Sequence, residues 1–253
     1  MKKLDFLNNR PIAHRGLFNK EAGIPENSIP AFERAISNGY PIEFDVHLLR
    51  DGEVVIFHDD SLNRMTNVNK KIKNCTYDEI KKLKLDETNY GIPLFSEVLD
   101  LVNGRVPILI ELKYDIKVGE LEEKVVEALQ DYKGKYAIQS FRPSSLIWFK
   151  NNYPLIPRGQ LSASFNKDSK MIFLKKFVLK NVYLNFLTKP NFISYCIDAF
   201  PNKRVEEYRK KGNLVIGWTV RNNSDLRIAK NYCDNVICEN FNKINLEIFK
   251  KYN

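Results

Sequence analysis

Several features that identify common protein classes are missing from this chain of 253 residues. Its four cysteines form no Cys-x-x-Cys pair, which counts against a zinc knuckle and against a disulfide framework. No stretch of about 18 or more apolar residues occurs, so no transmembrane segment is expected. The basic N-terminus lacks the apolar stretch of a secretory signal. We therefore expect reduced thiols and a cytoplasmic location.

Motifs for nucleotide and nucleic-acid binding are also missing. No Gly-x-Gly-x-x-Gly turn follows an early strand, which counts against a doubly wound dinucleotide-binding sheet. The net charge of +9 comes mainly from scattered lysines, with no RNP-like, zinc-finger or arginine-rich pattern. A solvated basic surface with a general attraction for anionic substrates is favoured over nucleic-acid binding.

What the chain does contain is a regular alternation of short apolar runs and helix-like stretches. Strands that alternate with helices over this length predict an α/β fold, a (β/α)8 TIM barrel formed by residues 1–253 as a single domain. A doubly wound open sheet is the main structural alternative. The expected strands are Pro11–His14, Ile42–Leu49, Pro107–Lys113, Tyr136–Phe141, Arg158–Leu161, Phe192–Tyr195, Leu214–Val220 and Asn235–Cys238. The expected helices are Ile29–Asn38, Ser96–Val102, Glu120–Tyr132, Pro143–Asn151, Lys203–Lys211 and Ser224–Tyr232, with Ser28 as an N-cap and Gly39 closing the first.

One segment departs from this alternation. Val54–Phe57 follows Leu49 after a short link that contains Asp51-Gly52, and a link this short joins only antiparallel strands. We therefore expect a β-hairpin arm after strand 2, outside the parallel count. The arm would return His58 toward the second strand.

Histidine is scarce, and all three histidines lie between residues 14 and 58. Because side chains alternate along a strand, Glu43, Asp45 and His47 share one face of the second strand. An ordinary half-exposed strand would show such a face to solvent. Two carboxylates and an imidazole, followed by His58 after a tight turn, are more typical of a metal and proton-transfer site.

Other polar residues stand where the expected strands end. In barrels the chemistry gathers at the carboxyl ends of the strands, and these positions are otherwise occupied by Val, Ile and Leu. The pattern therefore predicts a site there. The residues concerned are His14, Arg15, Glu111, Lys113, Gln139, Ser140 and Trp218.

From His14 to Glu239 the chain resembles the glycerophosphodiester phosphodiesterases. No single motif is specific, but the ordered set is. It comprises His14-Arg15-Gly16, Pro25-Glu26-Asn27-Ser28, Glu43-x-Asp45-Val46 with Asp51-Gly52, His58-Asp59-x-x-Leu62-x-Arg64-x-Thr66, Pro93-Leu94-x-x-Glu97-Val98-Leu99, Ile110-Glu111-Leu112-Lys113 and Trp218-Thr219-Val220.

This resemblance implies a TIM barrel that hydrolyses glycerophosphodiesters to glycerol 3-phosphate and an alcohol. It implies one divalent ion, held by Glu43, Asp45 and Glu111. Oxygen ligands select Mg²⁺ or Ca²⁺, and the sequence does not choose between these ions. His14 and His58 are the implied acid–base pair, with the roles of acid and base left open. The implied route is attack by the substrate's own 2-hydroxyl, followed by hydrolysis of a cyclic phosphate.

Further residues have less defined expected roles. Arg15 and Lys113 are placed near the phosphate, with ion pairing to the carboxylates as the alternative. Trp218 is assigned to substrate binding as an aromatic wall beside the glycerol. His47 and Gln139 are candidates for supporting the site from behind.

Some positions depart from the family pattern or are ambiguous. Leu49, Arg221 and Cys238-Glu239-Asn240 replace the usual residues at the rim and in strand eight, which puts the alcohol specificity in doubt. Glu26 is expected to cap the helix that follows rather than to join the site. In Met171–Leu187, an outer barrel helix running into a loop is favoured over a lipid-facing lip, so peripheral membrane contact is not expected.

Two other functions remain as alternatives. The first is a lysophospholipase D-type hydrolase acting on membrane lysolipids, and the second is a non-catalytic barrel that binds phosphorylated ligands. The complete set of histidines and carboxylates counts against the non-catalytic barrel. The sequence predicts no oligomeric state.

Overall fold

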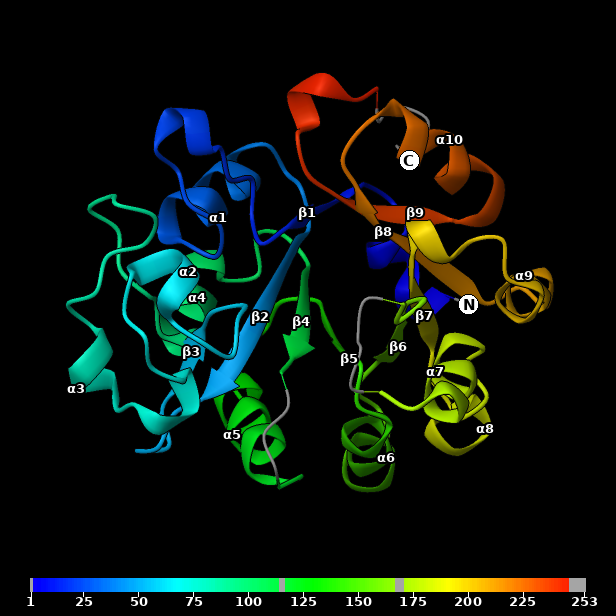
Figure 1. The fold of residues 1–253 in the computed structure, drawn as a ribbon, viewed down its shortest axis with the longest axis horizontal. Coiled ribbons are helices and arrows are strands. Elements are labelled where there is room, and N and C mark those ends of the chain that lie inside the picture. The colour runs from blue at the N-terminus through cyan, green and yellow to red at the C-terminus, as the bar shows by residue number, and fades with distance from the viewer. Residues whose placement is uncertain (1, 114–116, 167–170, 246–253) are drawn as a thin grey trace. The chain divides into compact units, whose positions relative to one another are not determined.

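The structure is a computed structural model that describes residues 2–113, 117–166 and 171–245. The chain forms two compact units, one of residues 13–136 and the other of residues 1–12 with 137–253. Strands and helices alternate along both units (Figure 1).

In the unit of residues 13–136, strand β2 lies at the centre of the sheet. It pairs in parallel with β1 and with β4, and its register sets His14 opposite Glu43 and Asp45 opposite Glu111. Every residue of β2 except the last is buried, as expected for a strand covered on both faces. The strands and helices of this part of the unit are β1 (Ile12–His14), η2 (Lys20–Ala22), α1 (Ile29–Ser37), β2 (Ile42–Leu48), α4 (Phe95–Val102), β4 (Ile108–Leu112) and α5 (Glu120–Leu129).

Helix α1 begins and ends close to the predicted residues, but its cap differs. Ser28 occupies the N-cap position without a side-chain capping bond, because its hydroxyl donates instead to the Pro25 carbonyl at 2.6 Å. Gly39 follows the helix with φ +66° and donates its N–H to the Ile36 carbonyl at 2.9 Å. Ser28 is thus the N-cap residue as expected, although its side chain makes no capping bond, and the expected closure by Gly39 is confirmed.

The predicted arm is strand β3 (Val54–Ile56), which pairs antiparallel with β2. Gly52 in the connecting turn has φ +87°, a conformation that favours glycine. The segment between β2 and α4 also contains α2 (Asn63–Thr66), η3 (Ile72–Asn74) and α3 (Tyr77–Ile80), which were not predicted because single turns leave no periodic signal. These elements enclose a small core of Leu49, Val55, Phe57, Leu62, Met65, Ile72, Cys75, Ile80, Leu85 and Ile92.

In the second unit, strands β5 to β9 pair in parallel in chain order. Its core packs residues of β7 (Phe192–Cys196), β8 (Leu214–Val220) and β9 (Asn235–Cys238) against residues of helices α9 (Lys203–Lys210) and α10 (Asn223–Tyr232), with Tyr195 fully buried. Its elements are η1 (Lys2–Leu7), β5 (Tyr136–Ser140), α6 (Pro143–Asn152), β6 (Arg158–Ser162), α7 (Phe173–Lys180), α8 (Asn185–Thr188), β7 (Phe192–Cys196), η4 (Ile197–Ala199), α9 (Lys203–Lys210), β8 (Leu214–Val220), α10 (Asn223–Tyr232), β9 (Asn235–Cys238) and η5 (Phe241–Lys243).

Together these strands confirm the (β/α)8 TIM-barrel class, with β3 as the additional hairpin arm. Each predicted strand agrees with the structure to within one residue at either end. The helix predicted over Glu120–Tyr132 is too long, since α5 ends at Leu129. Among the described residues, no helix has the length and apolarity needed to cross a bilayer.

Candidate functional site

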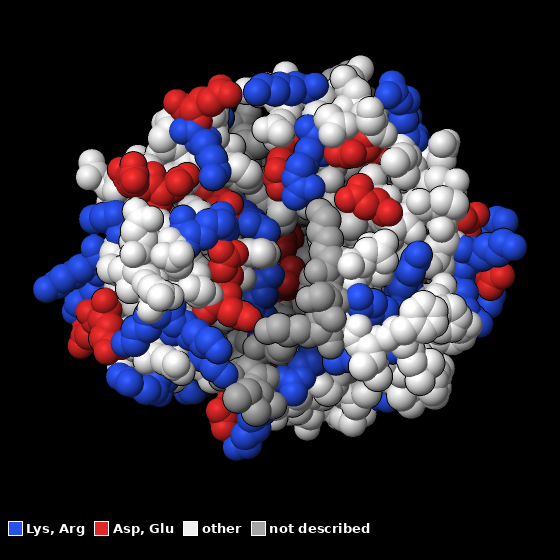
Figure 2. Space-filling model, viewed as in Figure 1, with Lys and Arg blue, Asp and Glu red and all other residues white. Residues whose placement is uncertain are grey.

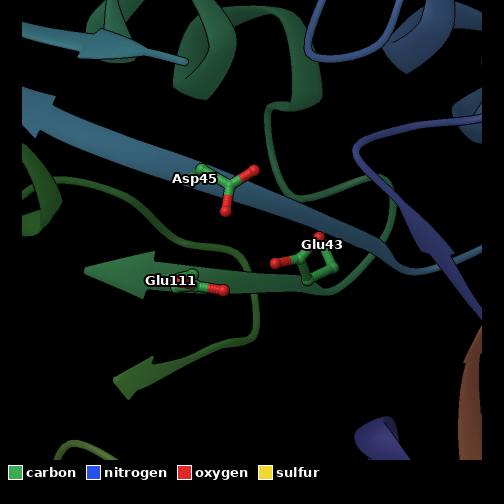
Figure 3. A group of neighbouring side chains, drawn as sticks. All are labelled: Glu43, Asp45 and Glu111. Atoms are coloured by element: carbon green, nitrogen blue, oxygen red, sulfur yellow. The ribbon is translucent and has the colours of Figure 1, made fainter. Parts of the chain in front are cut away.

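Three acidic side chains meet on two adjacent strands. Glu43 and Asp45 come from β2 and Glu111 from β4, and each offers an oxygen within 4.8 Å of the others (Figure 3). Alternation along β2 puts the first two on one face, and the register of β4 adds the third opposite Asp45. All three are buried, with exposed fractions of 1%, 0% and 8%.

This acidic triad is electrostatically unbalanced. Burial, together with the neighbouring Asp45 and Glu111 carboxylates, raises the pKa of Glu43 well above its ordinary value. Burial also raises the pKa of Glu111, although Lys113 acts in the other direction. Burial opposes ionisation of Asp45 too, but Lys113, His58 and Arg15 outweigh it and hold the pKa of Asp45 far below its usual range. The triad therefore needs positive charge.

Two cations supply part of that charge. Lys113 places its Nζ 2.8 Å from Asp45 Oδ1 and also contacts the Glu111 carboxylate. Arg15 Nε lies 3.6 Å from Asp45 Oδ2, and the Arg15 backbone N–H donates to Glu43 Oε2 at 3.2 Å. Both residues, expected near the phosphate, are in this structure ion-pair partners of the carboxylates.

The donor set of the acidic triad fits a hard divalent ion. The three carboxylates outnumber the two cations that contact them, Arg15 and Lys113, and all the donor atoms are oxygen. Hard cations such as Mg²⁺ and Ca²⁺ prefer oxygen ligands. A bound dication would also remove the repulsion that raises the pKa of Glu43 and Glu111.

The turn after β1 holds Arg15 in place. Arg15 and Asn27 both adopt positive φ angles, 55° and 53°, and the Asn27 N–H donates to the Arg15 carbonyl at 2.9 Å. A Cβ on Gly16, whose φ is +81°, would lie 2.9 Å from the Ala31 Cβ, so only glycine fits between the turn and α1. This contact explains the glycine of the His-Arg-Gly motif.

Asn27 is a site residue for which the sequence predicted no role. Its side-chain amide is buried and donates to Asp45 Oδ2 at 2.8 Å. It therefore orients one carboxylate of the acidic triad. Its place in the Pro25–Ser28 motif was the available signal.

The two candidate catalytic histidines reach the site from different elements. His14 ends β1, and its Nε2 lies 3.9 Å from Glu43 Oε2. His58 follows β3, where the Phe57 N–H donates to the Asp45 carbonyl at 3.0 Å and so ties the arm to β2. His58 Nδ1 lies 2.5 Å from Asp59 Oδ1, which fits a proton on Nδ1 and leaves Nε2 as the atom available to substrate.

A chain of ion pairs connects His58 to Arg15. Arg64 donates through Nε to Asp59 Oδ2 at 2.6 Å and through Nη2 to Glu26 Oε1 at 2.7 Å. Glu26 Oε1 also accepts from Arg15 Nη1 at 2.6 Å. The expected capping role of Glu26 is wrong, because its carboxylate is buried between these two guanidinium groups.

His47 lies behind His58. It is buried, and its Nε2 is 3.3 Å from the His58 carbonyl oxygen. Burial and the positive charge of Lys113 lower the pKa of His47 to about 4. The imidazole is therefore neutral near pH 7 and supports the backbone of His58.

Gln139 and Trp218 belong to the second unit. Gln139 is buried on β5 and accepts a hydrogen bond from Ser194 Oγ at 2.7 Å. Trp218 on β8 packs edge-on against Phe141, with ring centroids 5.5 Å apart. Their expected roles at the site remain predictions.

Known proteins resemble the chain over most of its length. The profile of the glycerophosphoryl diester phosphodiesterase family matches residues 14–242. A glycerophosphodiester phosphodiesterase of Caldanaerobacter subterraneus is 31% identical over 90% of this chain and 93% of its own. One from Bacillus altitudinis is 35% identical over 68% of this chain and 74% of its own.

A solved phosphodiesterase structure and a lysophospholipase D are also similar to the chain. An Oleispira antarctica phosphodiesterase, solved in complex with the product sn-glycerol-3-phosphate, has a TM-score of 0.76 at 23% identity and covers 92% of this chain and 93% of its own. A lysophospholipase D of Mus musculus is 32% identical over 70% of this chain but only 55% of its own length. The chain thus belongs to the glycerophosphoryl diester phosphodiesterase family and is a phosphoric diester hydrolase.

Proposed function

We propose that the chain hydrolyses small glycerophosphodiesters to glycerol 3-phosphate and an alcohol, with one divalent ion held by Glu43, Asp45 and Glu111. The observation that carries this proposal is the convergence of three buried carboxylates, with oxygens within 4.8 Å of one another, in a chain of this family. When bound, the ion would neutralise charge on the phosphodiester and so permit nucleophilic attack. Mg²⁺ and Ca²⁺ fit the oxygen donors equally.

His14 and His58 are proposed to move the protons. An imidazole accepts or donates a proton near neutral pH, and each such transfer contributes about 10²–10⁴-fold. His58 would use Nε2, because Asp59 holds Nδ1. His14 would use the Nε2 that faces Glu43. Either histidine can act as the base while the other acts as the acid.

We propose that the substrate supplies its own nucleophile. One histidine removes the proton of the glycerol 2-hydroxyl, whose oxygen attacks phosphorus, while the other histidine protonates the departing alcohol. The P–O bond to the alcohol breaks, and water then opens the cyclic phosphate. If slow variants release no cyclic phosphate while ¹⁸O from water enters the first-formed phosphate, direct attack by water replaces this route.

The remaining residues are proposed to position the substrate. Arg15 and Lys113 hold positive charge at the acidic triad, where they would also meet a phosphate oxygen. Asn27 would keep Asp45 in one orientation. Trp218 is proposed as an aromatic wall for the glycerol.

A coupled assay tests the function directly. Purified protein is incubated with glycerophosphocholine and Mg²⁺ or Ca²⁺, and glycerol 3-phosphate is detected with glycerol-3-phosphate dehydrogenase. We expect product formation that EDTA abolishes and added metal restores. No activity on glycerophosphocholine together with activity on lysophosphatidylcholine would favour the lysophospholipase D function. No activity on either substrate would favour a barrel that only binds phosphorylated ligands.

A cytoplasmic location is also proposed. Cys75, Cys233 and Cys238 are buried free thiols. Unpaired cysteines are typical of reducing compartments. We further propose that residues 1–253 act as a single domain, which one cooperative unfolding transition would support.

A further inference from the structure

Helices α7 and α8 expose a set of large hydrophobic side chains. We call this set the apolar patch: Ile172 (69% exposed), Phe173 (83%), Leu174 (66%), Phe177 (46%), Phe186 (71%) and Leu187 (40%). In Figure 2, uncharged side chains gather at the lower right, where α7 and α8 lie in Figure 1, with basic side chains beside them. Single exposed hydrophobic residues are common, but a gathered patch of this kind usually marks a binding surface.

The sequence-based expectation of an ordinary outer helix does not explain this exposure. Such a helix buries an apolar stripe, whereas α7 has no fully buried residue. Polar bonds to its backbone hold its end in place instead: the Leu179 carbonyl accepts from Ser162 Oγ at 2.8 Å, and the Lys180 carbonyl accepts from Tyr195 Oη at 3.0 Å. The helix is thus attached through its carbonyls while Phe173, Leu174 and Phe177 remain exposed.

Helix α8 is attached in a similar way. Lys150 on α6 donates from Nζ to the Leu187 carbonyl at 2.7 Å, and Arg158 on β6 donates to the carbonyls of Thr188 and Lys189 at 3.1 and 3.0 Å. Phe186 nevertheless remains 71% exposed. The outward direction of the patch is therefore part of the folded arrangement.

All the charged side chains within the described residues 171–197 are basic. Lys175, Lys176 and Lys180 lie in α7 and Lys189 directly follows α8, while the sequence from 171 to 197 contains no Asp or Glu. A second copy of this chain would bring these lysines against one another. Apolar side chains among lysines are instead complementary to a bilayer surface with anionic headgroups.

We propose that α7 and α8 dock this protein on anionic lipid bilayers. Phe173, Phe186 and their neighbours enter the boundary between headgroups and acyl chains, and the lysines contact the headgroups. This surface binding is separate from the hydrolysis proposed above and does not depend on it.

Vesicle sedimentation of the full chain tests the proposal. Vesicles of phosphatidylcholine mixed with phosphatidylglycerol should bring down the protein, whereas phosphatidylcholine alone should not, and raising the salt concentration should weaken binding. The Phe173→Ser/Phe186→Ser variant should lose at least about tenfold in partitioning, because two large apolar side chains no longer insert. The Lys175→Gln/Lys176→Gln/Lys180→Gln variant should lose about a hundredfold, at about fivefold per lysine.

Matched controls separate the patch from general charge and hydrophobicity. Lys81→Gln/Lys82→Gln/Lys84→Gln changes three exposed lysines of the other unit by the same charge, and Tyr90→Ser removes an exposed aromatic there. Both controls should bind as the unsubstituted protein does. If they lose binding equally, or if the protein ignores anionic vesicles, the proposal is wrong.

A fluorescence measurement checks insertion without removing the patch. Phe173→Trp places an indole at the most exposed position of α7. Its emission should shift to shorter wavelength on anionic vesicles, since the indole leaves water. An unchanged emission wavelength would contradict insertion. The proposal would also be wrong if the protein does not bind vesicles and instead forms a dimer, seen by analytical ultracentrifugation, that the Phe173→Ser substitution dissociates.

Discussion

The two units of this chain bury polar side chains in opposite ways. In residues 13–136, Glu43, Asp45 and Glu111 place like charges within 4.8 Å of one another. In the other unit, the buried polar residues on strands are neutral apart from Arg158, whose guanidinium donates to backbone carbonyls. The neutral set is Gln139, Ser140, Gln160, Ser162, Ser194, Thr219 and Asn235.

This difference separates buried polar side chains that are satisfied within the fold from buried side chains that repel one another. A neutral pair such as Gln139 and Ser194 forms its hydrogen bond internally and needs nothing further. Buried carboxylates that repel each other are unfavourable until a cation joins them. The first unit therefore carries an acidic triad that could bind a metal ion, and four substitution experiments test this difference between the units.

The largest effect is expected from the histidines. His14→Ala and His58→Ala should each lower kcat by about 10²–10⁴-fold, because one proton transfer is lost. Steady-state kinetics with glycerophosphocholine measure this effect, and circular dichroism checks the fold. His47→Gln is the comparison and should lose only about tenfold, as expected for a group behind the site. A His14 or His58 variant that keeps most of its rate would remove that residue from the proposed pair.

A smaller loss is expected when the support of His58 is removed. Asp59→Asn should lower kcat by about 10–100-fold with little change in KM, because the imidazole loses the carboxylate that orients it. Asp60→Asn, an exposed neighbour with the same change of charge, should leave kcat unchanged. Equal losses in both variants would indicate a general electrostatic effect rather than positioning.

The acidic triad should also make stability depend on pH. In EDTA, the raised pKa of Glu43 means that the folded state holds this proton more tightly than the unfolded state. Its stabilising contribution is complete below the unfolded pKa of about 4.5 and is lost as the pH rises through the folded pKa, so Tm should fall across that range.

A bound metal ion and the Glu43→Gln substitution should each reduce the fall in Tm with rising pH. Mg²⁺ or Ca²⁺ at about 100 times its Kd would add about 2.7 kcal/mol to the free energy of unfolding. Glu43→Gln should flatten the pH dependence in EDTA, whereas Glu33→Gln at an exposed position of α1 should not. Melting curves recorded from about pH 5 to pH 8 measure this, and identical curves for both variants would contradict the account.

The smallest effect on activity is expected in the second unit. Gln139→Leu should leave kcat unchanged but lower the free energy of unfolding by about 1–3 kcal/mol, because the buried Ser194 hydroxyl loses its acceptor. Chemical denaturation measures the stability loss. Adding Ser194→Ala should recover part of it, since no donor is then left unpaired. A large fall in kcat would instead support the predicted role of Gln139 near the site.

Local patterns predicted most of the fold. Every parallel strand and the arm at Val54–Ile56 were expected within one residue, because apolar runs and the Asp-Gly turn carry strong short-range signals. The single-turn helices α2 and α3 leave no such signal and were missed. The end of α5 at Leu129 was misplaced because helix boundaries depend weakly on sequence.

The site was only partly visible in the sequence. Alternation along β2 joined Glu43 to Asp45, but the pairing of Glu111 with Asp45 depends on the register of β4. The bonds from Asn27 to Asp45 and from Arg64 to Glu26 connect residues 18 and 38 positions apart, and no local pattern encodes such contacts.

Spacing along a few neighbouring residues was enough to predict the order of strands and helices, the arm, and the acidic face of β2. Tertiary structure alone decided that Lys113 and Arg15 neutralise the acidic triad, that Asp59 and Arg64 hold His58, and that α7 faces its hydrophobic side chains outward. The physical reason is that burial, register and charge pairing arise between distant segments, where the energy of a side chain depends on neighbours supplied by folding.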